Sequence, residues 1–466
     1  MRIHRIKVDM ALGEQQTSAH DIIDCALAEA RRRGASAADA LLFESDALAA
    51  RVRGCEIDFV KQAREHSLGV RVFMPGPSGL RCAVASTRDL SRSAVESTAE
   101  AASALAGATA EDPAAGLPDG DFASDEPNLA LSAPEDRGVT VEARIEDARR
   151  AEAAARAVDP RIQNSEGSEV NSSFLKVSYS NSKGFFGSYE TASHVTSCVP
   201  IACQNGRMQI EYWSAVARRL SHLEDAAQIG RVAAERALRR LGARRVPTCT
   251  VPVIFEARVA RSLLGHLASC LSGSAIYRGL SFLTGRLGET IASPAVTVLD
   301  DGRLPGGLGS RPFDGEGLPT RRTVVMEKGK LSSYLLDTYS ARKLGLRSTG
   351  NATRGMGGSP SAGASNLWLE PGTPALSELV ASTPRGLLVT WLFGQGFNPT
   401  TGDFSRGAAG LWIENGEIAF PVEEITVAGN FGDMLRDIDA VGNDLLWLGA
   451  AAAPSFRVAR MTVAGE

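Results

Sequence analysis

The second half of the chain contains the stretch Gly396-Phe-Asn-Pro-Thr-Thr-Gly-Asp-Phe-Ser-Arg-Gly-Ala-Ala-Gly-Leu-Trp-Ile-Glu-Asn-Gly-Glu-Ile418, in which short β-forming runs alternate with turns built on glycine and asparagine. Comparable β-forming runs lie at 295–299, 323–326, 387–392, 409–413 and 418–421. A strand at 249–255 and a helix at about 256–272 precede them. Because frequent turns between short strands favour a mixed or barrel-like β architecture, we expect a β-rich domain with one internal helix.

The first half of the chain has a different sequence pattern, in which amphipathic helices alternate with strand-like runs. Helical periodicity is found at 20–34, 89–106, 141–158 and 224–241. Strand-like runs lie at 38–44, 48–60, 68–73 and 164–216, the last containing a hairpin at 173–189 that turns at Asn181-Ser-Lys-Gly184. This succession predicts a layered domain of helices and sheet.

These patterns predict an α+β fold in two domains, covering residues 1–247 and 248–466. The linker is placed at Arg244-Arg-Val-Pro247, which follows Gly242. Within the first domain, residues 107–138 contain four prolines and eight acidic residues against a single arginine. Because such a composition buries little apolar surface, we expect a long, poorly ordered surface loop.

Composition excludes several classes of function. The chain has 466 residues, and 50 Lys and Arg against 54 Asp and Glu leave a net charge of -4, so no basic field favours nucleic acid as a partner. No apolar run is long enough for a membrane span, and the first nine residues are too polar for a secretory segment. The seven cysteines include no CxxC pair, which is typical of reduced thiols. We therefore expect a cytoplasmic location without membrane contact.

Local metal-binding motifs are not found in the sequence. The closest two of the six histidines, His4 and His20, are 16 residues apart, so no helix presents two imidazoles one turn apart. His266 lies in the helix expected at 256–272, beside the apolar stripe formed by Val259, Leu263 and Leu267. A histidine in such a position is more often part of the interior than a metal ligand.

Two glycine-rich regions leave functional alternatives open. Residues 394–402 have the composition of a backbone nest for an anion, although a tight array of turns explains the same glycines. The carboxylates Asp300, Asp301, Asp314 and Glu316 lie close together in sequence. Paired acid and base catalysis is one interpretation of them, whereas the capping of turns at strand ends is the more ordinary one.

The stretch 396–418, followed by Pro421-Val-Glu-Glu-Ile-Thr-Val-Ala-Gly-Asn430, closely resembles the C-terminal signature of the TldD/PmbA family. The motifs Asp300-Asp-Gly-Arg-Leu-Pro-Gly-Gly, Phe313-Asp-Gly-Glu-Gly317, Tyr334-Leu-Leu-Asp-Thr-Tyr339 and Met461-Thr-Val-Ala-Gly465 are similar to that family as well. The resemblance extends from about residue 18 to the end of the chain and is strongest beyond residue 250.

The resemblance implies a cytoplasmic, two-subunit metalloprotease that acts on unfolded or short peptides; the family was once named for modulation of DNA gyrase. In its TldD subunit an HExxxH helix and a cysteine near the C-terminus hold zinc. Here the corresponding positions are Arg261, Ser262 and His266, and no cysteine follows Cys270. A single ligand does not hold a catalytic metal, and an arginine repels a divalent cation. The chain therefore resembles the zinc-free TldE/PmbA subunit, and no catalytic residue, metal or cofactor is assigned to it.

The partners implied by the resemblance are a TldD-like zinc subunit, in a heterodimer, and peptide substrates bound in a shared chamber; a homodimer of the isolated chain stays open. Strand addition, which reads the peptide backbone, is the expected mode of peptide binding. The helix with the altered metal positions and the segment 394–406 are the candidate peptide-facing or partner-facing elements. Within that segment the candidates are Gly394, Gly396, Asn398, Thr401, Asp403 and Arg406.

Two other functions remain as alternatives. The first is an autonomous hydrolase in which His266 acts with carboxylates such as Asp301, Asp314 or Glu316. The second is a regulatory protein that binds DNA gyrase without proteolysis. The first alternative predicts stoichiometric zinc in the isolated chain, and the second predicts a stable gyrase complex with no effect on peptide turnover.

Overall fold

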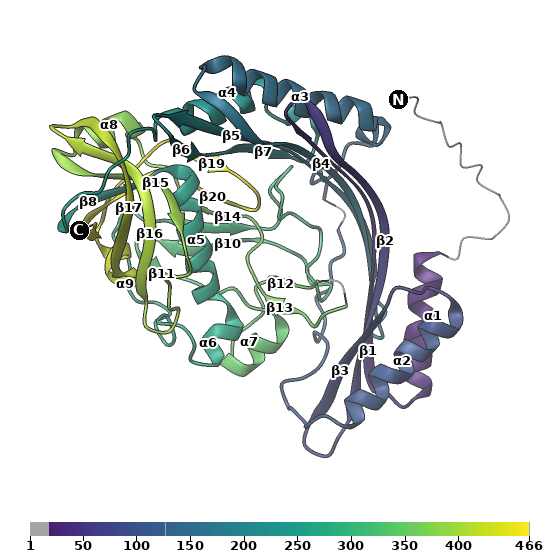
Figure 1. The fold of residues 1–466 in the computed structure, drawn as a ribbon. Coiled ribbons are helices and arrows are strands. Elements are labelled where there is room, and N and C mark those ends of the chain that lie inside the picture. The colour runs from purple at the N-terminus through teal and green to yellow at the C-terminus, as the bar shows by residue number, and fades with distance from the viewer. Residues whose placement is uncertain (1–17, 126, 356, 466) are drawn as a thin grey trace.

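A curved antiparallel sheet forms the N-terminal lobe of the protein. The computed structural model describes residues 18–125, 127–355 and 357–465. The sheet has the strand order β3-β2-β1-β4-β5-β6, and β7 also pairs with β5. Its strands are β1 (Ala37–Arg53), β2 (Glu56–Pro75), β3 (Leu80–Thr87), β4 (Ile162–Asn181), β5 (Phe186–Gln204), β6 (Arg207–Ile210) and β7 (Trp213–Ala217). The sheet bends into an arch around the other half of the chain (Figure 1).

Helices cover the convex side of the arch in two pairs (Figure 1). They are α1 (Ala19–Arg32), α2 (Arg92–Gly107), α3 (Val141–Val158) and α4 (Ala226–Leu238). Ser18 begins α1, because its hydroxyl accepts a hydrogen bond from the Asp21 backbone while Asp21 reciprocates. Ile23 and Ala26 of this helix are fully buried in a core shared with the sheet. The helices expected from periodicity are thus confirmed, with no end shifted by more than three residues.

One strand prediction in this lobe is wrong. The run 48–60 was expected as a single strand, whereas the chain reverses at Gly54 and Cys55 to form the long β1–β2 hairpin. Both residues have positive φ angles, of 63° and 66°. A two-residue turn of this kind matches the twist of its strands, and the glycine supplies one of the two conformations without strain.

A small closed barrel forms the centre of the C-terminal lobe. Its strands are β8 (Cys249–Phe255), β15 (Arg385–Phe393), β16 (Asp403–Glu414), β17 (Glu417–Asn430) and β21 (Phe456–Ala464), and the β17–β21 pairing closes the ring. β18 (Ile438–Val441) extends the same sheet beside β21. The expected α+β fold with a barrel-like second half is therefore confirmed.

The internal helix of this lobe is α5 (Ala257–Leu271). It buries one face that includes Leu263, Leu267 and Leu271, and these residues belong to the main hydrophobic core of the lobe. The spacing of these leucines by four residues places them on one side of the helix. The opposite side, which includes Gly265 and Ser269, is exposed.

A second, smaller sheet and several short elements complete the C-terminal lobe. The sheet has the order β11-β10-β9-β14-β20-β19. Its strands are β9 (Val298–Asp301), β10 (Arg322–Glu327), β11 (Lys330–Leu331), β14 (Leu367–Leu369), β19 (Leu446–Trp447) and β20 (Ala451–Ala453). The remaining elements are α6 (Gly273–Tyr277), α7 (Thr338–Leu344), α8 (Leu376–Ala381), α9 (Phe431–Arg436) and the paired strands β12 (Ala352–Thr353) and β13 (Ser361–Ala362).

The acidic segment 107–138 is more ordered than its composition predicts. Beyond the end of α2, its described residues include an isolated bridge between Asp112 and Leu80 and the 3-10 turn Pro134–Gly138, and Ala114, Leu117, Leu129 and Ala133 are buried. Its acids bind basic residues of the C-terminal lobe, in the pairs Asp112–Lys343, Asp119–Arg342 and Asp125–Arg303. The expectation of poor order is wrong because these long-range ion pairs and small apolar contacts tie the segment to the other lobe.

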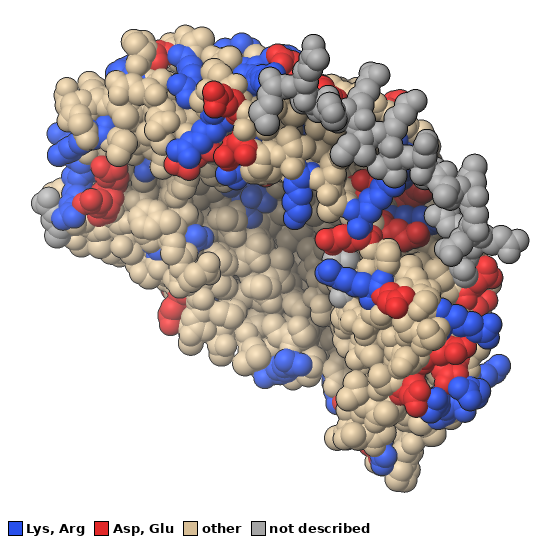
Figure 2. Space-filling model, turned by 45° about the vertical axis from the view of Figure 1, so that its right-hand side comes forward, with Lys and Arg blue, Asp and Glu red and all other residues tan. Residues whose placement is uncertain are grey.

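The surface between the lobes is hollowed. Figure 2 shows a hollow whose walls are mostly uncharged, with isolated Lys or Arg, while acidic and basic residues crowd the outer surface. Among the described residues, none of the helices combines the length and the apolar character that a membrane crossing requires.

Candidate functional site

The three positions that correspond to the zinc motif lie on α5, and they differ in their surroundings. Arg261 is half-buried, and its Nε atom is buried without a hydrogen-bond partner. Burial lowers the pKa of the Arg261 guanidinium, and the neighbouring Arg258 lowers it further, although Tyr212 acts in the opposite direction. The Ser262 hydroxyl donates to the backbone oxygen of Val259 at 2.7 Å and is thereby occupied within the helix.

His266 lies in an aromatic pocket. Its ring centroid is 4.5 Å from that of Phe397 and 6.5 Å from those of Phe404 and Phe431. A cation lies beside this ring, because Arg406 Nη1 is 3.5 Å from the His266 Nε2 atom. Burial and then Arg406 lower the pKa of His266, which keeps its imidazole neutral at pH 7.

The segment 394–406 lies beside α5 and consists of the turn between β15 and β16, at 394–402, and the first residues of β16. At Gly396 a Cβ atom would lie 1.6 Å from the backbone oxygen of Ser405, so only glycine fits there. The Asn398 side chain accepts from the Thr400 backbone at 3.0 Å, and the Thr401 hydroxyl donates to Asp403 at 2.6 Å. These side chains stabilise the turn itself, as expected for residues of this type.

Only part of the predicted site is brought together. Arg406 reaches His266, whereas Gly394 lies at the start of the turn with open space around it. Asn398, Thr401 and Asp403 are exposed and make their hydrogen bonds within the turn or to Asn430 next to it. In the described part of the chain no hydrogen bond or ion pair joins Arg261 to His266 or to the segment 394–406.

These residues do not fit a zinc ion. A catalytic zinc needs three protein ligands, whereas here one neutral imidazole faces an arginine and aromatic rings. Across residues 18–125, 127–355 and 357–465, no group of three or more His, Cys, Asp or Glu side chains is arranged to hold a metal ion. Arg406 lies beside the His266 imidazole, and Arg261 stands at the position of the first ligand, and the charge of each opposes a divalent cation.

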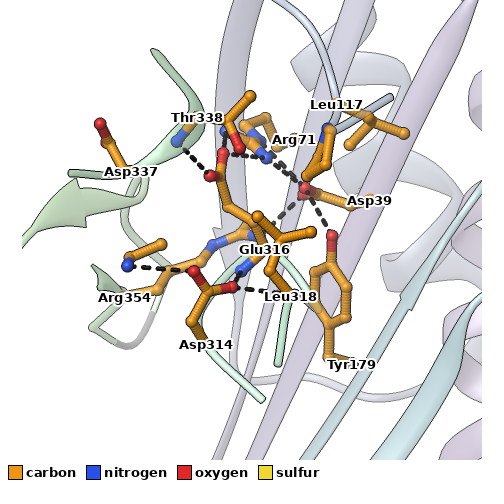
Figure 3. Close-up of polar contacts among 12 residues, drawn as sticks. Asp39, Arg71, Leu117, Tyr179, Asp314, Glu316, Leu318, Asp337, Thr338 and Arg354 are labelled. Carbon is orange, nitrogen blue, oxygen red and sulfur yellow. Dashed lines mark hydrogen bonds and ion pairs between the residues drawn. The ribbon is translucent and has the colours of Figure 1, made fainter. Parts of the chain in front are cut away.

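A cluster of buried charged groups lies elsewhere, where the concave face of the sheet meets the C-terminal lobe (Figure 3). We call this contact region the seam. Asp39 of β1 accepts from Arg71 Nε at 3.0 Å, from Arg354 Nη1 at 2.7 Å and from the Tyr179 hydroxyl at 3.2 Å. Burial favours the neutral acid, but Arg354 and Arg71 outweigh it and hold the pKa of Asp39 below its usual value.

Two more carboxylates enter the seam from the loop between β9 and β10. Glu316 contacts Arg71 at 3.4 Å and accepts from the backbone of Thr338 at 2.8 Å. Asp314 accepts from the backbone N–H groups of Glu316, Leu318 and Ala352. Burial raises the pKa of both carboxyls, and the charge of Glu316 helps to raise that of Asp314 to about 7. The folded protein therefore favours the protonated form of Asp314 at pH values up to about 7.

The carboxylates that the sequence offered for acid and base catalysis bind backbone and side-chain groups of neighbouring loops. Asp300 is fully buried, accepts from Asn351 and from the Ser365 backbone at 2.7 Å each, and burial raises its pKa to about 6. Asp301 accepts from the backbone of Arg303. Within the described residues no printed contact connects His266 with Asp301, Asp314 or Glu316, so the acids cap turns and hold loops, and a His–carboxylate pair does not form.

A second set of buried ions joins the lobes near the N-terminal end of α5. Glu256 accepts from Arg236 of α4 at 2.6 Å and from Arg239 at 3.0 Å. Arg258 donates to Glu211 at 2.7 Å. The sequence offered no local signal for these residues or for Asp39, Arg71 and Arg354, because each pair spans many residues of chain.

The two family models that match this chain describe domains of the same family. Residues 248–465 match the PmbA/TldA metallopeptidase C-terminal domain, and residues 134–241 match the central domain of the same family. The chain is 39% identical to Metalloprotease PmbA of Escherichia coli O157:H7 over 413 residues, and this alignment covers 88% of each chain. It is 36% identical to the Metalloprotease PmbA homolog of Haemophilus influenzae over 457 residues, and this alignment covers 98% of each chain.

Solved structures have the same fold. A protein from Bacteroides thetaiotaomicron VPI-5482, named for the modulation of DNA gyrase, matches with a TM-score of 0.88 and 29% identity over 97% of this chain and 100% of its own. TldE from Thermococcus kodakarensis matches with a TM-score of 0.84 over 94% of this chain and 99% of its own, at 22% identity. At that identity the second likeness concerns the fold alone.

Proposed function

The chain belongs to the TldD/PmbA metallopeptidase family, and from this membership we propose that it is the subunit of a two-chain peptidase that holds no catalytic metal. Its partner in a heterodimer is a TldD-like subunit, which carries the zinc. The complex acts on unfolded or short peptides. The role of this chain is to shape the enclosed space and to bind the peptide.

The observation that carries the proposal is the chemistry of α5. The positions that would supply the first ligand and the general base are Arg261 and Ser262, and the remaining His266 is packed against Phe397 beside Arg406. The Nε2 atom of this imidazole lies beside a guanidinium group, and one imidazole alone does not hold a catalytic metal. A peptidase fold with this helix needs its metal from another chain.

Peptide binding is supported by the shape and polarity of the molecule. A mostly uncharged hollow lies between the lobes (Figure 2), and such a surface suits substrates of varied sequence. The sheet of the N-terminal lobe ends in strands with a free edge, which is the feature that strand addition requires. The helix α5 and the segment 394–406 lie against each other through His266 and Phe397.

We also propose a cytoplasmic location for the complex. All seven cysteines are free thiols, and Cys198 and Cys270 are buried. Proteins of oxidising compartments commonly pair their cysteines, whereas free thiols are typical of the reducing cytosol.

The test is co-expression of the chain with a TldD-like subunit, followed by metal analysis and a peptide cleavage assay on an unstructured peptide. Cleavage should require both chains, should vanish with a chelator and should return with zinc. It should survive His266→Ala and His266→Phe in this chain, the second of which fills the aromatic pocket. Stoichiometric zinc in the isolated chain would instead support the autonomous hydrolase, and a gyrase complex without an effect on cleavage would support the regulatory alternative.

A further inference from the structure

A groove with an unusual combination of groups runs between β6 and the barrel strands β15–β17. Its volume is about 730 Å³. It is bounded by Arg207–Ile210 of β6, by residues 243–245, by Phe393 and by Glu423 and Glu424. We call it the β6 groove. It lies next to the segment 394–406, because Phe393 directly precedes Gly394.

The backbone of β6 has a free side that faces away from the sheet. β6 pairs with β5 alone, through a two-residue turn at Asn205 and Gly206, whose φ angles are 51° and 76°. In such a hairpin the pair next to the turn is hydrogen-bonded, so Met208, opposite Cys203, directs its N–H and C=O outward. The Cys203 N–H accordingly donates to Arg161, on the far side of β5.

The same strand presents apolar side chains to solvent. Met208 is 69% exposed and Ile210 is 40% exposed, and Phe393 across the groove is 47% exposed. Side chains of this size leave water only when something covers them, and the alternation along β6 places Met208 and Ile210 on the same face of the strand. An extended segment that carries an apolar residue at every second position would cover both.

The groove also carries an excess of positive charge. Four arginines line it against two glutamates. Glu424 is bound by Arg245 and Glu423 by Gln209, whereas Arg240 donates to the Ile210 oxygen and Arg244 stacks over Phe420. In the described residues Arg207 has no acidic partner. The charge favours an occupant with carboxylate groups.

The size of the groove favours a short peptide over a whole subunit. A stable interface between proteins involves about 20–30 residues on each side, whereas twelve residues line this groove. β6 has four residues, and at a rise of about 3.3 Å per residue its edge matches a segment of similar length. An extended peptide of about four to six residues satisfies both limits.

We propose that the β6 groove binds a short extended peptide of alternating apolar and acidic residues, which adds to β6 as a further strand. The inference rests on the proposed function, since it assigns a peptide site to the subunit without metal. Main-chain hydrogen bonds to Met208 hold the peptide, its apolar side chains cover Met208 and Ile210, and its carboxylates bind Arg207.

The test uses a fluorescent hexapeptide of alternating glutamate and valine with blocked ends, titrated with the isolated chain and followed by anisotropy. Binding should weaken about tenfold or more in Arg207→Gln and in Met208→Asp, because each removes or opposes a contact of the bound strand. Arg92→Gln, at an exposed arginine of α2, is the matched control and should bind as the unaltered chain does. A lysine–valine peptide should bind at least tenfold more weakly than the glutamate–valine peptide.

Two measurements keep the outcome clear even if a variant folds poorly. The same peptide with N-methyl groups on alternate amides cannot add to a strand, so it should lose binding to the unaltered protein. Hydrogen exchange should slow at residues 207–210 when the peptide binds. Equal binding of the acidic and basic peptides, or protection confined to the exposed edge of β2 at 56–66, would overturn the inference. Assembly with the zinc subunit, measured by size-exclusion chromatography, tests the proposed function separately.

Discussion

At the scale of single residues, the seam is organised by charge balance. Asp39 binds the guanidinium groups of Arg71 and Arg354, and Glu316 contacts Arg71, all with little access to water. The buried Asp314 carboxyl is bound by backbone N–H groups, and the charges that act on it are those of Glu316 and Arg311. An ionised Asp314 beside Glu316 would place two negative charges close together at low dielectric constant, and burial and Glu316 outweigh the opposing effect of Arg311. A proton on Asp314 removes one of these charges, which agrees with the raised pKa of this group.

Asp314→Asn tests this balance through the pH dependence of stability. The pKa of Asp314 is raised to about 7 in the folded protein from 3.8, so the stability contributed by its proton is complete below about pH 4 and is lost as pH rises through 7. Asparagine carries no charge, but its amide loses the hydrogen bond from Ala352, at a cost of about 1–2 kcal/mol. In urea, the free energy of unfolding of the unaltered protein should therefore exceed that of Asp314→Asn clearly at pH 5 and by a smaller amount at pH 8.5. Asp433→Asn on the surface is the control, and a difference that is constant with pH would contradict the prediction.

At the scale of elements, the turn between β15 and β16 depends on two glycines for different reasons. Gly396 has no room for a Cβ atom, which would overlap the Ser405 oxygen, whereas Gly394 has open space and a φ angle of 78°. Gly394→Ala should cost about 1 kcal/mol, the usual strain of a left-handed alanine. Gly396→Ala should cost about 3 kcal/mol or more, because the strand backbone must move.

Urea unfolding of the two glycine variants measures this difference, and near-ultraviolet circular dichroism reports whether the aromatic pocket around His266 is disturbed. Only Gly396→Ala should change the aromatic signal, because Phe397 follows that residue and packs on His266. Equal losses of stability in the two variants would show that conformation, and not the close approach to Ser405, sets the cost.

The elements that were predictable from sequence are those whose signals are local. The period of apolar residues located α3 at 141–158, which are its ends in the structure, and the glycine-rich runs indicated a barrel. The reversal at Gly54 was missed because a strand pattern continues on both sides of the turn. The acidic segment 107–138 was misjudged because its order comes from Arg303, Arg342 and Lys343, which lie about 180–230 residues away.

In the candidate site, too, only the features with a local sequence pattern were predictable. The altered metal positions were visible in the sequence because they are defined by spacing within one helix. The contact of His266 with Arg406 joins residues 140 apart, and the pair of Arg354 with Asp39 joins residues 315 apart. Asp39 and Arg71 are partners only because the β1–β2 register places them opposite each other. Such contacts follow from tertiary structure and leave no local pattern.

At the scale of the whole molecule, the two lobes are held together by buried ions as well as by apolar contacts. Phe313 of the C-terminal lobe packs on Leu41 and Tyr179 in the arch, and Glu256 binds Arg236 and Arg239 of the N-terminal lobe. The Glu256 side chain is 11% exposed; burial favours its neutral form, but Arg236 and Arg239 together outweigh burial and lower its pKa. Removal of this carboxylate leaves Arg239 without its ion pair and leaves Arg236 with only the longer contact to Glu211, at 3.9 Å.

Glu256→Gln should therefore destabilise the protein by about 3 kcal/mol, the usual cost of breaking one side of a buried ion pair. Glu289→Gln is the matched control, because Glu289 is 54% exposed and its pair with Arg286 is a surface pair worth about 1 kcal/mol or less. Hydrogen exchange should accelerate in the last turn of α4 and the first turn of α5 in the Glu256 variant alone. If both variants lose the same small amount, the apolar contacts of Phe313 and of Trp391 with Tyr212 hold the lobes together, and the ions only set their alignment.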